Sequence, residues 1–312
     1  MSMKKIGLAL LVILSSCSAE KESSEMYQDV KQISVQIEEM VPEGSESRVL
    51  RNDEGKFVWE KNDTLGIFPN VGGQVEFPID AKFVGTSRAE FDGGGWALRN
   101  NYTYSAYCPF NFYNRNAQSI PVSYVGQTQN GNNSKSHLSD KIFMASPPVD
   151  VVDGGLTFQM KHLCTLTELT LTLPVVATYT SVDIYTSDEI LPVKVAFNLK
   201  SAELTQTNIE YSNHYTVKLN NVKTTTKNED VTVWFATPVV VDADKTLKAV
   251  VKDSQGYVYV ADIITSSGNI ATVNFKRANK RTLKASPILT DGFQGGIEDW
   301  VNDGQDYGGI AN

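Results

Sequence analysis

Apolar and polar residues alternate with a period of two along much of this chain. The first clear case is residues 31–37 (KQISVQI), where Ile33, Val35 and Ile37 share one face and polar side chains occupy the other. Such alternation is typical of a β-strand with one buried face. It predicts a strand close to the start of the chain.

The second half repeats this pattern at short intervals. In residues 166–174 (LTELTLTLP), leucines alternate with threonines apart from one slip at Thr167-Glu168. At least seven further short strands are expected, in 181–186, 193–199, 214–220, 231–241, 246–253, 256–263 and 270–275. Short strands separated by turn residues indicate β-sandwiches rather than an alternating α/β fold. With 312 residues, the chain is expected to be all-β, with two sandwiches in tandem that meet near residues 160–170.

The first half is less regular. Strands are expected in 56–60, 64–68, 74–79 and 102–110, with Gly, Asn and Asp residues between them. Residues 126–140 (GQTQNGNNSKSHLSD) are polar and rich in asparagine, which predicts a long surface loop.

The first residues indicate export. Lys4 and Lys5 precede an apolar run, 6–14, and the motif Leu14-Ser15-Ser16-Cys17 is similar to a bacterial lipobox. In lipoproteins the cysteine of this motif is lipidated and becomes the mature N-terminus. Residues 1–17 are therefore expected to be a lipoprotein signal peptide, Cys17 the lipid attachment site and the polar residues after it a tether. The alternative is a plain signal peptide with an accidental cysteine.

Charge and composition argue against several classes of function. The chain has 36 acidic and 28 basic residues, a net charge of −8, which argues against a nucleic-acid partner. Three histidines are scattered without metal-ligand spacing, and no CxxC motif or nucleophile elbow is present. We therefore expect no metal, no cofactor and no enzymatic activity. Cys108 and Cys164 are either paired in a disulfide or buried as free thiols.

A polar segment, 40–56, follows the first predicted strand and carries Arg48 and Arg51. Exposed polar loops of this kind are natural protease sites. A cut after Arg51 would remove the tether and the first strand together.

Residues 57–68 (FVWEKNDTLGIF) resemble a segment of the fimbrillin family, the lipoprotein subunits of type V pili in Bacteroidales. The matching residues are Phe57, Trp59, Asp63, Leu65, Gly66, Ile67 and Phe68, and Asn62 stands where glycine is usual. Residues 102–110, 156–171 and 275–286 resemble further family segments in the same order. By their chemistry alone, Asp63 is expected to accept a backbone hydrogen bond in a tight turn, Gly66 to allow a close approach, and Trp59 to lie in the core.

The resemblance implies two transthyretin-like β-sandwich domains, 52–162 and 163–312, behind a removable segment, 18–51. It also implies a lipid-anchored precursor in the outer membrane and an Arg-specific protease that cuts after Arg48 (in Ser47-Arg48-Val49) or after Arg51. Loss of the strand with Ile33, Val35 and Ile37 would open a groove. The C-terminal segment of another subunit would then fill it with the apolar side chains of Ile288, Leu289, Phe293, Ile297 and Trp300.

The predicted function is thus a structural subunit of a surface fimbria that polymerises with other pilus subunits and supports cell adhesion. The poor alternation of the C-terminal segment leaves room for a tip or accessory role, and the receptor and the position in the pilus stay open. The alternative is a surface lipoprotein that binds glycans or host ligands without polymerising, with Tyr102, Tyr104, Tyr113 or Tyr257 as sugar platforms.

Overall fold

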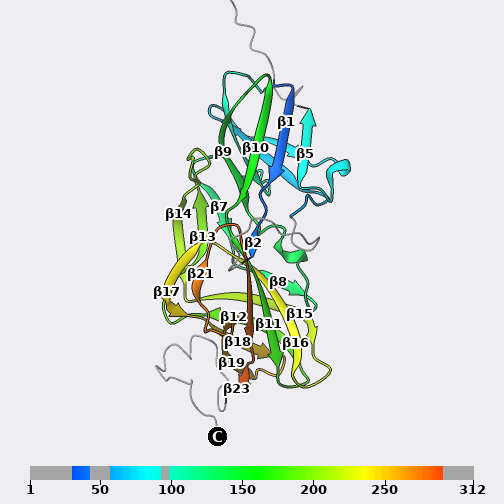
Figure 1. Ribbon diagram of the computed structural model, residues 1–312, viewed down its shortest axis with the longest axis vertical. Coiled ribbons are helices and arrows are strands. Elements are labelled where there is room, and N and C mark those ends of the chain that lie inside the picture. The colour runs from blue at the N-terminus through cyan, green and yellow to red at the C-terminus, as the bar shows by residue number, and fades with distance from the viewer. Residues whose placement is uncertain (1–29, 43–56, 93–97, 291–312) are drawn as a thin grey trace, which may run out of the picture.

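The computed structural model of the chain describes residues 30–42, 57–92 and 98–290. These residues form an elongated molecule of β-strands (Figure 1), and its helical elements are the 3-10 turns η1 (Ala81–Phe83) and η2 (Ser136–Leu138). The all-β prediction is confirmed for this part of the chain.

One end of the molecule is a seven-stranded sheet (Figure 1). Its strands in spatial order are β4 (Val75–Pro78), β3 (Thr64–Pro69), β6 (Thr103–Cys108), β9 (Met144–Asp150), β10 (Gly155–His162), β1 (Gln32–Ile37) and β5 (Arg88–Asp92). β1 runs parallel to β10 and antiparallel to β5, so it is an inner strand although it comes first in the chain.

The other end is a sandwich of two larger sheets. One contains β16 (Glu229–Thr237), β11 (Thr165–Leu173), β22 (Asn279–Ala285) and β2 (Val41–Pro42), and β20 (Ile264–Thr265) also pairs with β22. The other contains β23 (Ile288–Leu289), β19 (Val258–Asp262), β18 (Lys248–Asp253), β12 (Thr178–Tyr185), β15 (His214–Lys223) and β8 (Gln127–Asn130). Buried side chains of both sheets form one core, among them Leu171, Val233 and Leu283 from the first and Val182, Val217 and Val251 from the second.

Two small sheets complete the described fold. β14 (Gln206–Ser212), β13 (Leu191–Phe197) and β7 (Ile120–Ser123) form one, and β17 (Val240–Thr246) pairs with β21 (Thr272–Phe275). A second core, which includes Tyr124, Phe143, Phe197 and Trp234, joins the sheet of β7 and β13 to the seven-stranded sheet. Val273 and Phe275 of β21 belong to the core of the sandwich. A third core is formed by buried side chains of the seven-stranded sheet, and it contains Trp59.

The alternating patterns fold as expected where one face is buried. In β11, Leu169, Leu171 and Leu173 are fully buried, and the half-buried Thr170 and Thr172 lie between them. Burial of such a row of side chains stabilises the strand, since each fully buried leucine contributes about 1.5–3 kcal/mol.

Two local predictions were wrong. Residues 126–140 are not a long loop, because they contain β8 and η2 and because Gln127 and Gln129 are buried. The described residues 57–60 do not form a strand. Trp59 instead makes isolated backbone bonds, donating its N–H to the Thr86 carbonyl and accepting one from Gly85.

The chain changes sheets between β10, which ends at His162, and β11, which begins at Thr165. However, β7 and β8 precede this point and pair with β13 and β15, which follow it. The division into domains 52–162 and 163–312 stays a prediction. Cys108 and Cys164 are both buried free thiols, so they do not form a disulfide with each other.

Candidate functional site

β1 is the candidate site that both the alternation and the family resemblance indicated. Ile33, Val35 and Ile37 are 0%, 1% and 3% exposed and pack in the core of the seven-stranded sheet. The intervening Ser34 and Gln36 are half-buried on the other face. The prediction of a half-buried strand is confirmed.

β1 bonds with a neighbour on each side. Its parallel register with β10 runs from Gln32 opposite Gly155 to Ile37 opposite Met160, and its antiparallel register with β5 places Gln32 opposite Asp92. Without β1, backbone N–H and C=O groups of both neighbours would lose their partners and the core beneath would be open to water. Unpaired strand edges of this kind are templates for another strand.

The residues after β1 connect the seven-stranded sheet to the sandwich. Glu38 donates its backbone N–H to the Met160 carbonyl, and its carboxylate pairs with the Arg277 guanidinium at 2.8 Å. Met40 is buried, and Val41 of β2 pairs with Asn279 of β22. The segment 32–42 therefore contributes to both ends of the molecule.

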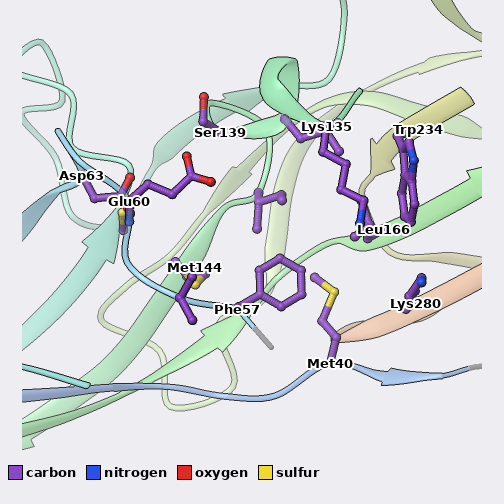
Figure 2. A pocket seen from close by; sticks show the side chains of 14 residues that line it. Met40, Phe57, Glu60, Asp63, Lys135, Ser139, Met144, Leu166, Trp234 and Lys280 are labelled. Carbon is purple, nitrogen blue, oxygen red and sulfur yellow. The ribbon is translucent and has the colours of Figure 1, made fainter. Parts of the chain in front are cut away.

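A pocket of about 200 Å³ lies beside Met40, near the end of segment 32–42 (Figure 2). Its apolar lining includes Met40, Phe57, Leu166 and Trp234. Figure 2 shows Met40 reaching in from the chain beside the Phe57 ring, with Lys280 nearby. The part of the pocket beside Met40 is apolar, so it can hold an apolar side chain from segment 32–42.

Charged groups lie on opposite sides of this pocket (Figure 2). The ammonium groups of Lys135 and Lys280 lie 4.1 and 5.0 Å from the centre of the Trp234 ring. Such cation–π contacts stabilise a lysine over an indole face. On the other side lie Glu60 and Asp63. Burial raises the pKa of the Asp63 carboxyl, and the hydrogen bond from the Glu60 N–H opposes that shift.

The turn before β3 has the predicted chemistry. Asn62 has a φ of +80°, a conformation that asparagine tolerates better than most residues, and the Asp63 carboxylate accepts the Glu60 N–H at 2.8 Å. Gly66 lies against the Tyr107 ring, and Trp59 is fully buried. These residues serve the fold and bring one wall of the pocket into place.

The other predicted site residues are only partly described. Cys17, Arg48, Arg51, Phe293, Ile297 and Trp300 lie outside the described residues. Ile288 and Leu289 form β23, which pairs with β19, and both side chains are exposed. Of the four candidate sugar-binding tyrosines, Tyr104 is buried, Tyr102 is half-buried, and Tyr113 and Tyr257 are exposed.

In residues 30–42, 57–92 and 98–290, no three His, Cys, Asp or Glu side chains gather as metal ligands would. Among these same residues, no helix has the length and apolar character needed to cross a membrane.

The sheets and their shared cores define an all-β protein of the β-sandwich kind. No protein-family model matches the chain, and no curated protein matches it. Among solved structures, it is similar to a "putative cell adhesion protein" from Bacteroides ovatus, at 14% identity and a TM-score of 0.52, over 85% of this chain and 95% of that one.

Two further solved structures are more distant. A protein of the same description from Bacteroides uniformis has 10% identity and a TM-score of 0.45, over 84% of this chain and 97% of that one. A fimbrial protein from Bacteroides ovatus has 9% identity and a TM-score of 0.37, over 83% of this chain and 50% of that one. The Bacteroides ovatus adhesion protein shares the fold with this chain. The expected all-β, β-sandwich class is confirmed, and the arrangement as two tandem domains stays a prediction.

Proposed function

We propose that this protein is a structural subunit of a cell-surface fimbria that polymerises by strand exchange and supports cell adhesion. The observation that carries the proposal is the position of β1. It is an inner strand with a buried apolar face, yet it belongs to an N-terminal segment that one cut would detach. Loss of a strand that lies between two neighbours, β10 and β5, would leave a groove with an unpaired strand edge on each side.

The N-terminal sequence supports the route to the surface. A lipobox ending at Cys17 would give a lipid-anchored precursor in the outer membrane, and Arg48 and Arg51 offer cut sites for an Arg-specific protease. In the sequence, both arginines come after β2, which ends at Pro42, and before Phe57, which lines the pocket. A cut after either would detach β1 and β2 and leave the pocket lining from Phe57 onward in place.

The C-terminal segment is the proposed donor. β23 is the edge strand of its sheet, and Ile288 and Leu289 are exposed there. The residues that follow supply Phe293, Ile297 and Trp300 as apolar side chains. A donor strand would bond with both β10 and β5, and its alternate side chains would enter the core that Ile33, Val35 and Ile37 leave.

The test starts from the soluble chain beginning at Ser18, treated with an Arg-specific protease. Mass spectrometry locates the cut, and native gels follow assembly. The expected result is a cut after Arg48 or Arg51 followed by a ladder of oligomers. The double variant Arg48→Ala/Arg51→Ala should stay uncut and monomeric, and Arg115→Ala, a change at an exposed loop arginine, is the matched control. Oligomers formed by the uncut double variant would contradict the proposed maturation.

One observation favours the alternative of a non-polymerising ligand-binding lipoprotein. Phe112 and Tyr113 are exposed neighbours. Their rings pack edge to face, with 5.8 Å between the ring centres. Exposed aromatic rings are common platforms for sugars. Glycan-array binding by a monomer that forms no oligomers after cleavage would favour this function.

A further inference from the structure

The C-terminal segment repeats the sequence pattern of the strand it would replace. Residues 33–41 read ISVQIEEMV, and residues 293–301 read FQGGIEDWV. Large apolar side chains occur at the first, fifth and eighth positions of both, and two acidic residues follow the shared isoleucine in each. The pairs are Ile33 and Phe293, Ile37 and Ile297, Glu38 and Glu298, Glu39 and Asp299, Met40 and Trp300, and Val41 and Val301.

In segment 33–41, the matched positions include the residues that are buried, form an ion pair or line the pocket. Ile33 and Ile37 are buried in the core of the seven-stranded sheet. Glu38 makes two contacts with the Arg277 guanidinium, at 2.8 and 3.4 Å. Met40 is buried at the edge of the pocket of about 200 Å³. A copy of this pattern can satisfy the same core, cation and pocket only in one register.

We propose that the C-terminal segment of a second copy of this chain takes the place of segment 33–41, with Phe293 at the position of Ile33 and Trp300 at that of Met40. This register rests on the proposed strand exchange and specifies its residues. Glu298 then pairs with Arg277, which loses Glu38 when the N-terminal segment leaves. The pocket beside Met40 gives the larger Trp300 side chain room, between Phe57 and Lys280 (Figure 2).

The donor has to be another molecule. β23 lies at the opposite end of the long axis from β1 (Figure 1). Three residues separate Leu289 from Phe293, so this connection reaches about 14 Å at most. The tail of one copy can instead enter the β1 end of the next copy directly.

In this register the donor strand runs in the same direction as β1, which is compatible with assembly into a fibre. β1 runs toward the middle of the molecule, where β2 lies (Figure 1). A donor in the same direction enters at the outer end and pairs parallel to β10, as β1 does. Joining the β23 end of one copy to the β1 end of the next is a head-to-tail contact, and such contacts generate open filaments.

One buried position is left empty in this register. Val35 is 1% exposed, and its counterpart in the tail is Gly295. The next position, Gly296, corresponds to Gln36, which is half-buried on the opposite face. The two adjacent glycines therefore face opposite sides of the acceptor sheet and provide a matched pair for a test.

The experiment uses the full chain from Ser18, cut by the Arg-specific protease, with assembly measured as the apparent Kd between subunits. Gly295→Val should lower this Kd about tenfold, because a valine would fill the site of Val35. Gly296→Val should leave it within about threefold, since its side chain would lie outside the core. Trp300→Ala should raise the Kd at least about tenfold by removing the side chain in the pocket.

A charge exchange gives an independent readout. Glu298→Arg should weaken assembly several-fold, and combining it with Arg277→Glu should restore it, because the pair is then reversed at every contact. Equal effects of the two valine variants, or no rescue by the charge exchange, would overturn the register while oligomers still form. If the cut wild-type chain forms no oligomers at all, strand exchange itself fails.

Discussion

Gly66 lies in β3 directly beneath the ring of Tyr107. A Cβ added at Gly66 would come within 2.2 Å of a ring carbon, far closer than atoms can approach. The ring is held in place, because the Tyr107 hydroxyl donates to the Gln74 side chain at 2.6 Å and also meets Asn111 and Asn114. The glycine therefore allows a contact between neighbouring strands that no other residue permits.

We expect Gly66→Ala to lower the free energy of unfolding by about 1–3 kcal/mol, through forced displacement of the ring. Gly73→Ala is the control, since an added Cβ there has no atom within 4 Å. Urea denaturation of both variants measures the difference. Equal unfolding midpoints for the two would contradict the role of the Tyr107 contact.

His162, at the end of β10, is buried, and its ring centre lies 4.3 Å from that of Phe57. Burial, aided by the nearby Arg277 charge, lowers the pKa of His162 to about 3. The unfolded value is about 6.5, so between pH 6.5 and pH 3 the unfolded chain binds the proton more readily. The contribution of His162 to stability is complete above pH 6.5 and is lost as the pH falls through this window.

The variant His162→Phe should therefore flatten the loss of stability in acid, by up to about 1.4 kcal/mol for each pH unit between 6.5 and 3. Denaturant titrations at several pH values test this directly. An unchanged slope in the variant would show that the imidazole does not resist protonation in the fold.

At the scale of elements, the side chains of β8 protect the edge of the neighbouring sheet. The Gln127 amide donates to the Ala236 carbonyl at 2.9 Å and accepts the Ala236 N–H at 2.8 Å. Gln129 does the same for the Thr232 carbonyl and the Trp234 N–H. β16 is an edge strand, so these amides supply the hydrogen bonds that a further strand would make.

Gln127→Leu should lower stability by about 2–4 kcal/mol, because both backbone groups of Ala236 would be buried without partners. Gln118→Leu, at an exposed position, is the control and should change stability by less than about 0.5 kcal/mol. Thermal or urea unfolding measures both, and light scattering detects association through the uncovered edge. A loss no larger than that of the control would contradict the edge-capping role.

The strands that alternation predicts well are those with one buried face, such as β1 and β11. β8 escaped prediction because its buried residues are glutamines, whose polarity indicates a loop until their partners on β16 are known. Sheet order was likewise beyond the sequence, since alternation defines the faces of a strand and not its neighbours. The pocket gave no local signal, because Met40, Phe57, Trp234 and Lys280 come from distant segments that only the fold brings together.

At the scale of the whole molecule, the proposed surface location depends on Cys17. We expect Cys17→Ser to abolish incorporation of a labelled fatty acid and to move the protein from the membrane fraction to the soluble fraction. Ser16→Ala, which keeps a small residue before the cysteine, should be labelled normally. Labelling that persists in Cys17→Ser would show that the lipid is attached elsewhere or that the lipobox resemblance is accidental.

The position of β1 also has a consequence for the order of folding. Gln32 leaves the ribosome early, but its partners Asp92 and Gly155 are made much later. Adjacent strands such as β3 and β4, or β9 and β10, need only short loops to pair and can form sooner. We therefore expect β1 to insert late, into a sheet whose other pairings form without it. Pairings that form without β1 would stay intact on its departure, so the proposed replacement of β1 is compatible with a folded subunit.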